Sequence, residues 1–280
     1  MSLLDPVKRM DTNQRLTDIG RQVVRWREIT GYSHPVEPGS SLGADDRVFP
    51  LVPPSHLIWH GISHAVDHLD MFMHPLIETK LSFPIAPQTL ARSGVLGAAH
   101  ALWMLDAATR NERQLRALRI FHEECRNERN AYDELAKSGD AAAGMADIVA
   151  VRSRWMAEAV QAGLAIGCTA EQVKDKPVET KLLDEVITRY QQVRPSPPGD
   201  GTMLSTYRLI WRMHSGVAHG YRWPIMYRAD FSKAVLDGVD ERNLGGLVSN
   251  NLDQLATSAI SMSLLIGRAF ELYNLRRVVH

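Results

Sequence analysis

The stretch that decides the fold is LARSGVLGAAHALWML, residues 90–105. Among these sixteen residues only Arg92, Ser93 and His100 are strongly polar. A helix that is apolar on every side is typical of one surrounded by other helices. The stretch therefore predicts a buried helix at the centre of a bundle.

Helical periodicity continues on both sides of this stretch, and no segment shows the sustained alternation that indicates a strand. We therefore expect an all-α protein, a multi-helix bundle of about eight helices, with Asp5 as the first N-cap. Thr169 and Gln172 have the spacing of a capping box that opens a short additional helix. The main helices are predicted over about residues 6–30, 55–74, 87–107, 111–137, 142–166, 179–192, 202–219 and 243–278.

The chain of 280 residues, 45% of them hydrophobic, is long enough to bury a core without a metal or a disulfide. We expect a single all-helical domain over residues 1–280. A possible subdivision separates 1–54, with an N-terminal helix and a Pro/Gly-rich loop at 31–54, from a central bundle at 55–193 and C-terminal helices at 194–280. Residues 220–242 are predicted to be an irregular excursion or lid.

The charges of the chain cancel. Thirty-two Lys and Arg residues balance 32 Asp and Glu residues, so the formal net charge at pH 7 is zero. This excludes the global positive field of a protein that binds nucleic acid mainly through phosphates, but it permits a local basic groove. P-loop and nucleophile-elbow motifs are missing from the sequence, which argues against P-loop ATPases and α/β-hydrolases.

The two cysteines, Cys125 and Cys168, form no CxxC motif, so neither a zinc ribbon nor a thioredoxin-like site is expected. Widely spaced cysteines fit a reducing, cytoplasmic location. The first dozen residues carry too many charges for a secretory signal peptide. The most apolar segment, 255–270, contains Arg268 and several hydroxyl side chains, so we expect a buried helix and no membrane.

The strongest candidate for a functional site is the helix predicted over residues 202–219. At 100° per residue, its core stripe contains Met203, Tyr207, Ile210, His214 and Val217. The opposite face carries a polar row: Ser205, Arg208, Arg212, Ser215 and His219. Such a row suits a phosphodiester, with histidine as general acid or base and arginine stabilising developing charge. The alternative is a solvated polar face whose histidine is favoured by the helix C-terminus.

Two residues inside this helix have structural explanations. His214 falls among the apolar positions, so we expect a core histidine bonded to a backbone carbonyl. Gly216 destabilises a helix by about 1 kcal/mol relative to alanine. Its presence indicates either tight packing or a nearby ligand.

Arg212 and His219 are separated by six residues, and this spacing resembles the R-x4-6-H motif of the HEPN superfamily. HEPN proteins are helical bundles that include metal-independent ribonucleases, toxins and antiviral effectors. The resemblance implies HEPN-like character in the C-terminal half and an RNA-cleaving site, often completed across a homodimer, with Arg212 as cationic clamp and His219 as proton shuttle. Met213 follows the arginine, where the family frequently has Asn, Asp or His. The segment 92–103 is also similar to uncharacterised actinobacterial helical proteins.

A second candidate is a row of histidines at intervals of four: His56, His60, His64 and His68. Adjacent members are within chelating reach of each other, but each step rises about 6 Å and turns about 40° beyond a full circle, so only a pair could share a metal. We therefore predict no metal and no cofactor, and interpret the row as a solvated or subunit-facing stripe. A metal-dependent helical enzyme remains the alternative.

Arginines form the third candidate. Arg92 lies in the most apolar helix and must find a carboxylate or a bound anion, because it cannot lose its charge. It is a candidate substrate-binding residue, together with Arg208 and Ser215, in a cavity shared with Arg212; a salt bridge to a neighbouring helix is the alternative. The other arginines, at positions 110–129, are expected mostly on solvated surface with pairs at i,i+3 and i,i+4.

The sequence thus leads to a hypothesis and a rival. The hypothesis is a protein that handles RNA or nucleotide phosphodiesters, such as a metal-independent endoribonuclease of a toxin or defence system, and that acts as a homodimer. The rival is a non-catalytic helical interaction module, in which the polar row is ordinary surface.

Overall fold

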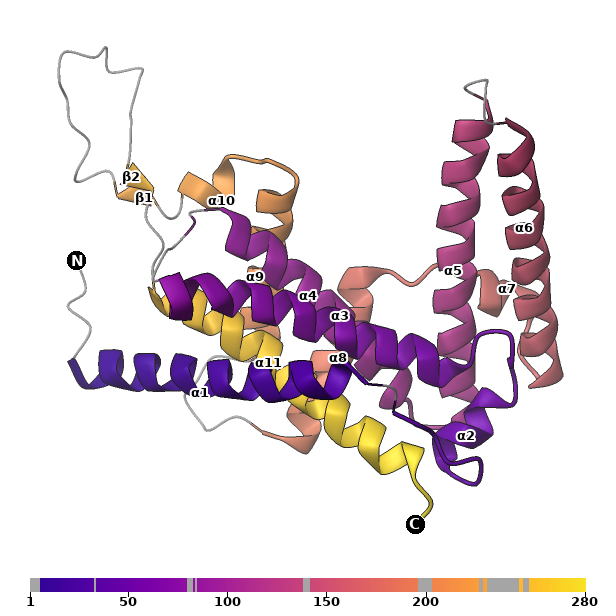
Figure 1. Cartoon of the computed structure of the whole chain (residues 1–280), viewed down its shortest axis with the longest axis horizontal. Helices are drawn as coiled ribbons and strands as arrows, with labels where there is room; N and C mark the ends of the chain where they lie inside the picture. Colours follow the sequence, from indigo (N-terminus) through magenta and orange to yellow (C-terminus); the bar gives the residue numbers. More distant parts are fainter. Residues whose placement is uncertain are drawn as a thin grey trace. The chain divides into compact units, whose positions relative to one another are not determined.

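The computed structural model describes the following residues: 6–32, 34–79, 83, 85–137, 142–195, 203–226, 229–230, 247–248 and 252–280 (Figure 1). Nearly all regular structure in these residues is helical, so the predicted all-α multi-helix class is confirmed. The helices are α1 (Pro6–Thr30), α2 (Ser41–Asp46), α3 (Pro54–His74), α4 (Ala86–Leu105), α5 (Arg110–Ala136), α6 (Ala142–Ala165), α7 (Ala170–Lys174), α8 (Glu179–Val193), α9 (Met203–Ala218), α10 (Trp223–Met226) and α11 (Leu252–Arg277). A π-helical turn covers Pro75–Thr79, and the two-residue strands β1 (Ala229–Asp230) and β2 (Leu247–Val248) pair antiparallel.

The chain divides into two compact units, each of which we describe by itself. Unit 1 takes its described residues from Met1–Ser33, Ile62–Ala98 and Tyr190–Arg268. Unit 2 takes its described residues from His34–Gly61, Ala99–Arg189 and Ala269–His280. Each unit therefore combines segments that are distant in the sequence, and the helices α3, α4, α8 and α11 contribute residues to both.

Side-chain caps explain where several helices begin. Thr109 caps α5 and Ser40 caps α2, each by accepting a hydrogen bond from a backbone N–H of the first turn. Thr169 and Gln172 form the predicted capping box of α7. Each cap satisfies a backbone donor that has no partner within its own helix. The N-cap predicted at Asp5 lies outside the described residues.

The core of unit 1 is built on α4, as its apolar sequence predicts. Gly94 permits the close approach of two other helices. A Cβ atom at this position would lie 2.7 Å from Sδ of Met262 in α11 and 3.3 Å from Cβ of His68 in α3. The buried apolar residues of α4 in this unit are Ala91, Val95 and Ala98.

Unit 2 contains the hairpin of α5 and α6, which Figure 1 shows side by side, with α7 packed against both. One cluster of buried apolar residues in this unit consists of Phe49, Leu118, Phe121, Cys125, Ala159 and Val173. At the start of α5, Nε of Arg113 donates a hydrogen bond of 2.8 Å to Asp45, and the two side chains are 8% and 1% exposed. A buried ion pair therefore joins α5 to α2.

Two predicted boundaries are wrong. Residues 31–54 are not all loop, because Ser40 caps helix α2 within them. The last helix begins at Leu252 rather than near 243, because Leu247–Val248 pairs with β1 instead of continuing the helix. Of the lid expected over 220–242, the structure describes residues 220–226, which hold the turn at Gly220 and α10, and residues 229–230, which form β1.

The prediction that the arginines of α5 are mostly solvated is wrong for three of them. Arg113 is buried, and Arg116 and Arg119 have side chains 16% and 20% exposed. The guanidinium groups of Arg116 and Arg119 lie 4.8 and 5.2 Å from the centre of the Trp103 ring. Asp45 and Trp103 lie outside α5, so the periodicity of α5 alone could not indicate these contacts.

By length and composition, α11 is the one helix in the described part of the chain that could cross a membrane. Its most apolar window has a mean hydropathy of 1.3, and 61% of that window is buried inside the protein. A core helix of a folded protein shows the same combination of apolar composition and burial.

Candidate functional site

The polar row predicted on α9 is present as a surface of unit 1. Arg208, Arg212 and His219 are exposed, and Ser215 is half-buried. The opposite side of the helix is anchored in the core, where the hydroxyl of Tyr207 donates a 2.7 Å hydrogen bond to the carbonyl of Ser261 in α11. Burial raises the pKa of this phenol far above its ordinary value. Of the predicted core stripe, Tyr207, His214 and Val217 are buried and Met203 and Ile210 are half-buried, while the polar row faces outward.

The C-terminal end of α9 fixes the position of His219. Gly220 adopts a φ of +72°, which glycine tolerates better than other residues. The N–H of Gly220 bonds to the carbonyl of Val217, and the N–H of Tyr221 bonds to that of Gly216, both at 2.9 Å. This is a Schellman motif. It turns the chain so that the rings of His219 and Tyr221 lie 6.0 Å apart between centroids.

Tight packing explains the glycine within α9. A Cβ atom at Gly216 would lie 2.7 Å from Cγ of Pro224 and 3.0 Å from the Trp223 ring. Both neighbours belong to α10, which follows the Schellman turn and folds back onto α9. Of the two explanations suggested by the sequence, the contact with α10 accounts for the absence of a side chain.

Arg92 reaches α9 from α4. Its guanidinium carbon lies 4.6 Å from the centre of the Trp211 ring, a cation–π contact. On the surface of a helix, the neighbours of a residue are those three and four positions away. Arg208 and Ser215 stand at these positions relative to Trp211. The structure thus brings Arg92 to the same side of α9 as the other two residues predicted to bind substrate.

Arg212 and His219 lie along the same exposed side, about 10 Å apart along the helix axis. Helix α9 carries no acidic residue, so its cations are not neutralised within the helix. Arg92 lies on Trp211, and a cavity shared by Arg92 and Arg212 stays a prediction. The row forms a surface that can contact an anion but does not by itself enclose one.

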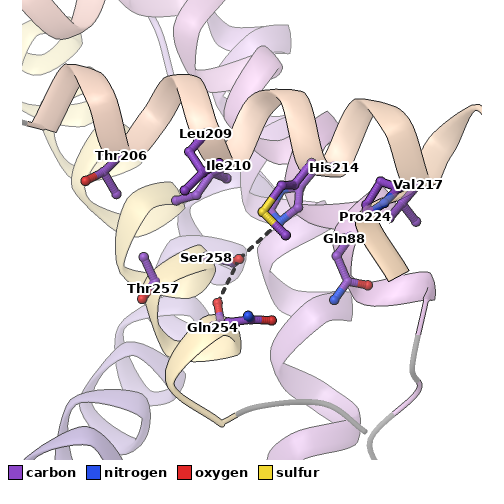
Figure 2. A pocket seen from close by; sticks show the side chains of 11 residues that line it. Gln88, Thr206, Leu209, Ile210, His214, Val217, Pro224, Gln254, Thr257 and Ser258 are labelled. Atoms are coloured by element: carbon purple, nitrogen blue, oxygen red, sulfur yellow. Dashed lines mark hydrogen bonds between the residues drawn. The ribbon is translucent and has the colours of Figure 1, made fainter. Parts of the chain in front are cut away.

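A cavity of about 190 Å³ lies on another side of α9, between that helix and α11 (Figure 2). His214 is buried there, as predicted, but Nε2 lies 3.3 Å from the side-chain Oγ of Ser258, where the sequence predicted a backbone carbonyl as its partner. This hydroxyl also lies 3.0 Å from the carbonyl oxygen of Gln254. The lining residues are Gln88, Thr206, Leu209, Ile210, Met213, His214, Val217, Pro224, Gln254, Thr257 and Ser258.

Sequence reasoning did not find this cavity. Ser258 is 44 residues from His214, so no local motif joins them. The available signal was the adjacent pair Thr257 and Ser258 in the largely apolar segment 255–270. Polar side chains at such positions need partners or a solvent-filled space.

The histidine row of α3 is divided between the units. His56 and His60 are exposed, whereas His64 and His68 are half-buried with ring centroids 4.1 Å apart. Nδ1 of His68 lies 2.8 Å from the carbonyl oxygen of His64, so this nitrogen already has a backbone partner. The described residues contain no group of three or more His, Cys, Asp or Glu side chains placed to hold a metal ion.

His100, in the central apolar stretch, lines a groove of about 500 Å³ in unit 2. Glu123 and Glu124 of α5 line the same groove. Burial raises the pKa of Glu124, against the opposing effect of the nearby His60. Glu123 is paired with Arg126 and Lys176, so it is engaged in ion pairs within the fold.

No family model, no curated protein and no solved structure matches the chain. The resemblance to HEPN proteins therefore depends on the spacing of Arg212 and His219 in the sequence.

Proposed function

We propose that the exposed face of α9 binds RNA and cleaves its backbone without a metal ion, with Arg212 and His219 at the reacting phosphate. The observation that supports this most is the grouping of three arginines, Arg92, Arg208 and Arg212, around one side of a helix that has no acidic residue and ends in a histidine. This supplies a local cationic surface on a chain with no net charge. An activity of this kind suits a ribonuclease of a toxin or defence system.

The proposed reaction needs only a proton carrier and a cation. The ribose 2′-oxygen forms a bond to the adjacent phosphorus while the bond from phosphorus to the 5′-oxygen breaks, which leaves a 2′,3′-cyclic phosphate and a 5′-hydroxyl. Neutral His219 takes the proton of the 2′-hydroxyl, and a protonated histidine gives one to the 5′-oxygen. The guanidinium of Arg212 stabilises the negative charge that develops on the phosphate oxygens.

A second copy of the chain would complete this site. Arg212 and His219 are exposed, and an open surface does not exclude water from the reacting phosphate. Facing copies of α9 would enclose the phosphate and supply the second histidine that the proton transfers require. Light scattering at micromolar concentration should then give about twice the 31.3 kDa mass of the chain. A monomer at every concentration would exclude the two-copy site.

The activity is tested with a panel of structured and single-stranded RNAs in excess chelator. Cleavage should proceed, yield ends with a 2′,3′-cyclic phosphate, and stop when the cleaved position carries a 2′-deoxyribose. An intact panel would refute the ribonuclease proposal, as would cleavage that depends on added metal.

A second candidate function is a non-catalytic interaction module, favoured by an apolar patch on unit 1. Large exposed apolar side chains gather there at the end of α3 and the start of α4: Met71, Ile77, Phe83 and Ile85. A hollow of about 240 Å³ lies beside them, lined only by apolar residues, Phe72 and Leu90 among them. Contiguous exposed apolar surface often marks a protein–protein contact. If the RNAs stay intact while Phe83→Glu weakens self-association, the interaction module becomes the better account.

A further inference from the structure

The cavity between α9 and α11 has the size of a site for one ring system. An apolar cavity of roughly 150 Å³ accommodates benzene, and this cavity measures about 190 Å³. Figure 2 shows α9 on one side of it, with Gln254, Thr257 and Ser258 of α11 and Gln88 of α4 across from that helix. Small-molecule sites commonly combine such an apolar lining with a few convergent polar groups.

The lining selects an uncharged ligand. None of the residues that surround the cavity is a Lys, Arg, Asp or Glu. A phosphate or carboxylate placed inside would therefore lose its hydration without a fixed counter-charge, which is strongly unfavourable. Three polar side chains of the lining are at least nine-tenths buried: His214 and Ser258 at 5% exposed and Gln88 at 7%. Side-chain amides both donate and accept, so they can bond to a ring edge that presents donors and acceptors.

The hydrogen bonds of His214 and Ser258 favour binding over nucleophilic catalysis. The hydroxyl of Ser258 donates to the carbonyl of Gln254 at 3.0 Å. The same oxygen lies 3.3 Å from Nε2 of His214, and with its own proton directed to the carbonyl it is placed to accept a hydrogen bond from that nitrogen. With its proton directed to a carbonyl, Ser258 is not activated by the histidine as a nucleophile would be. These hydrogen bonds hold His214 and Ser258 in a fixed orientation at the side of the cavity. Groups that position a ligand are held in the same way.

The mouth of the cavity borders the arginine face. Thr206 and Leu209 line the cavity and are exposed, so they mark its opening to solvent. Arg212 follows Leu209 by three positions, which makes them neighbours about 5–6 Å apart on the helix surface. A negatively charged group attached to a ring inside the cavity would therefore emerge beside the guanidinium of Arg212.

We infer that this cavity binds the uncharged base of a nucleotide whose phosphate lies against Arg212. The inference rests on the proposed function insofar as Arg212 is the phosphate-binding residue. It adds that the protein also recognises the base of the nucleotide. The base lies inside the cavity, beyond Leu209 as seen from Arg212, and Gln88, Gln254 and His214 contact its edge.

Isothermal titration of the full chain with nucleoside 5′-monophosphates, free nucleosides, ribose 5-phosphate and inorganic phosphate tests the inference. At least one monophosphate should bind with one site per chain, its nucleoside about tenfold more weakly, and the two base-free compounds at least 100-fold more weakly. Binding of none of the monophosphates or nucleosides would overturn the inference. Inorganic phosphate binding as tightly as a monophosphate would also overturn it.

Variants locate the ligand. Thr206→Phe should block the mouth and reduce nucleoside binding at least tenfold, whereas Thr17→Phe on exposed α1 should leave it unchanged. Thr257→Phe, at a second exposed position of the lining, replaces Thr206→Phe if that variant does not fold by circular dichroism. Arg212→Ala should remove the advantage of the monophosphate and spare the nucleoside. Wild-type nucleoside binding by Thr206→Phe, or by Thr257→Phe where it is the replacement, would refute the cavity. Nucleoside binding by a protein that leaves RNA intact would refute only the proposed function.

Discussion

The guanidinium carbon of Arg92 lies 4.6 Å from the centre of the Trp211 ring, so α4 delivers a cation to the face of α9 that carries the predicted site. Each arginine in contact with a phosphate releases counterions, which makes RNA affinity fall as salt rises. Arg92→Leu keeps an apolar cover on Trp211 but removes this charge. We expect weaker RNA binding and a plot of log affinity against log salt that is shallower by about one unit.

Fluorescence anisotropy with labelled single-stranded RNA, from low to moderate salt, gives this slope. Arg25→Leu on exposed α1 is the matched control and should keep the wild-type slope. An unchanged slope for Arg92→Leu would mean that Arg92 has only a packing role.

The buried ion pair between Arg113 and Asp45 should be sensitive to the loss of one partner. Asp45→Leu leaves Arg113 buried without its carboxylate, and removing one partner of a buried pair typically destabilises a fold by about 3–5 kcal/mol. The double variant Asp45→Leu, Arg113→Met removes both charges and should recover most of that loss. Urea unfolding of the wild type, the single variants Asp45→Leu and Arg113→Met, and the double variant measures the coupling free energy between the two side chains. Additive effects of the two substitutions would contradict the account of this pair.

Two glycines in helices should respond to alanine in opposite directions. Gly216→Ala should destabilise the protein, because its Cβ would meet Pro224 and Trp223 at 2.7–3.0 Å. Gly144→Ala in α6 has no atom within 4 Å of the new Cβ, so it should stabilise by about 0.5–1 kcal/mol. Thermal unfolding compares the two variants. Equal or stabilising effects of both would mean that α10 does not pack on α9 as described.

The buried thiol of Cys125 should react slowly with alkylating reagents and should lose its proton only at high pH. Burial raises its pKa to about 11, so the native protein keeps the thiol protonated over a range where the unfolded chain, with an ordinary pKa near 8.5, has lost the proton. Because the folded state binds more protons in this window, stability should fall as pH rises from about 8.5 to 11.

Iodoacetamide labelling at pH 8, followed by peptide mass spectrometry, measures how fast the thiol of Cys125 reacts. The half-exposed Cys168 should be modified well before Cys125, and both should react alike in denaturant. Cys125→Ala should flatten the alkaline decline in stability. Rapid labelling of Cys125 in the native protein would contradict its burial.

Local patterns in the sequence were sufficient for most helices and for the two sides of α9. The apolar stretch around Gly94 predicted a central helix, and Thr169 with Gln172 predicted a cap, because both depend on residues close together in the chain. The pairing of Leu247–Val248 with β1 was missed, because it joins residues almost twenty positions apart.

In the candidate site, too, features within one helix could be predicted from the sequence, whereas contacts between helices could not. The outward direction of Arg212 and His219 follows from helical phase alone. The contact of Arg92 with Trp211 and the hydrogen bond of His214 with Ser258 join different helices, so no spacing within one segment could reveal them. The cavity beside Leu209 depends on how α4, α10 and α11 pack around α9.

The central claim is tested most directly by the rate at which His219→Ala cleaves RNA in chelator, compared with wild type and with His56→Ala. His56 is an equally exposed histidine outside the site, so its variant should retain the wild-type rate. His219→Ala should lose roughly 100-fold or more of the rate, the usual contribution of general acid–base catalysis, and Arg212→Lys should also be impaired because a point charge cannot replace the planar guanidinium. All three variants should remain folded, since these side chains are exposed. Cleavage by His219→Ala at the wild-type rate would contradict the account.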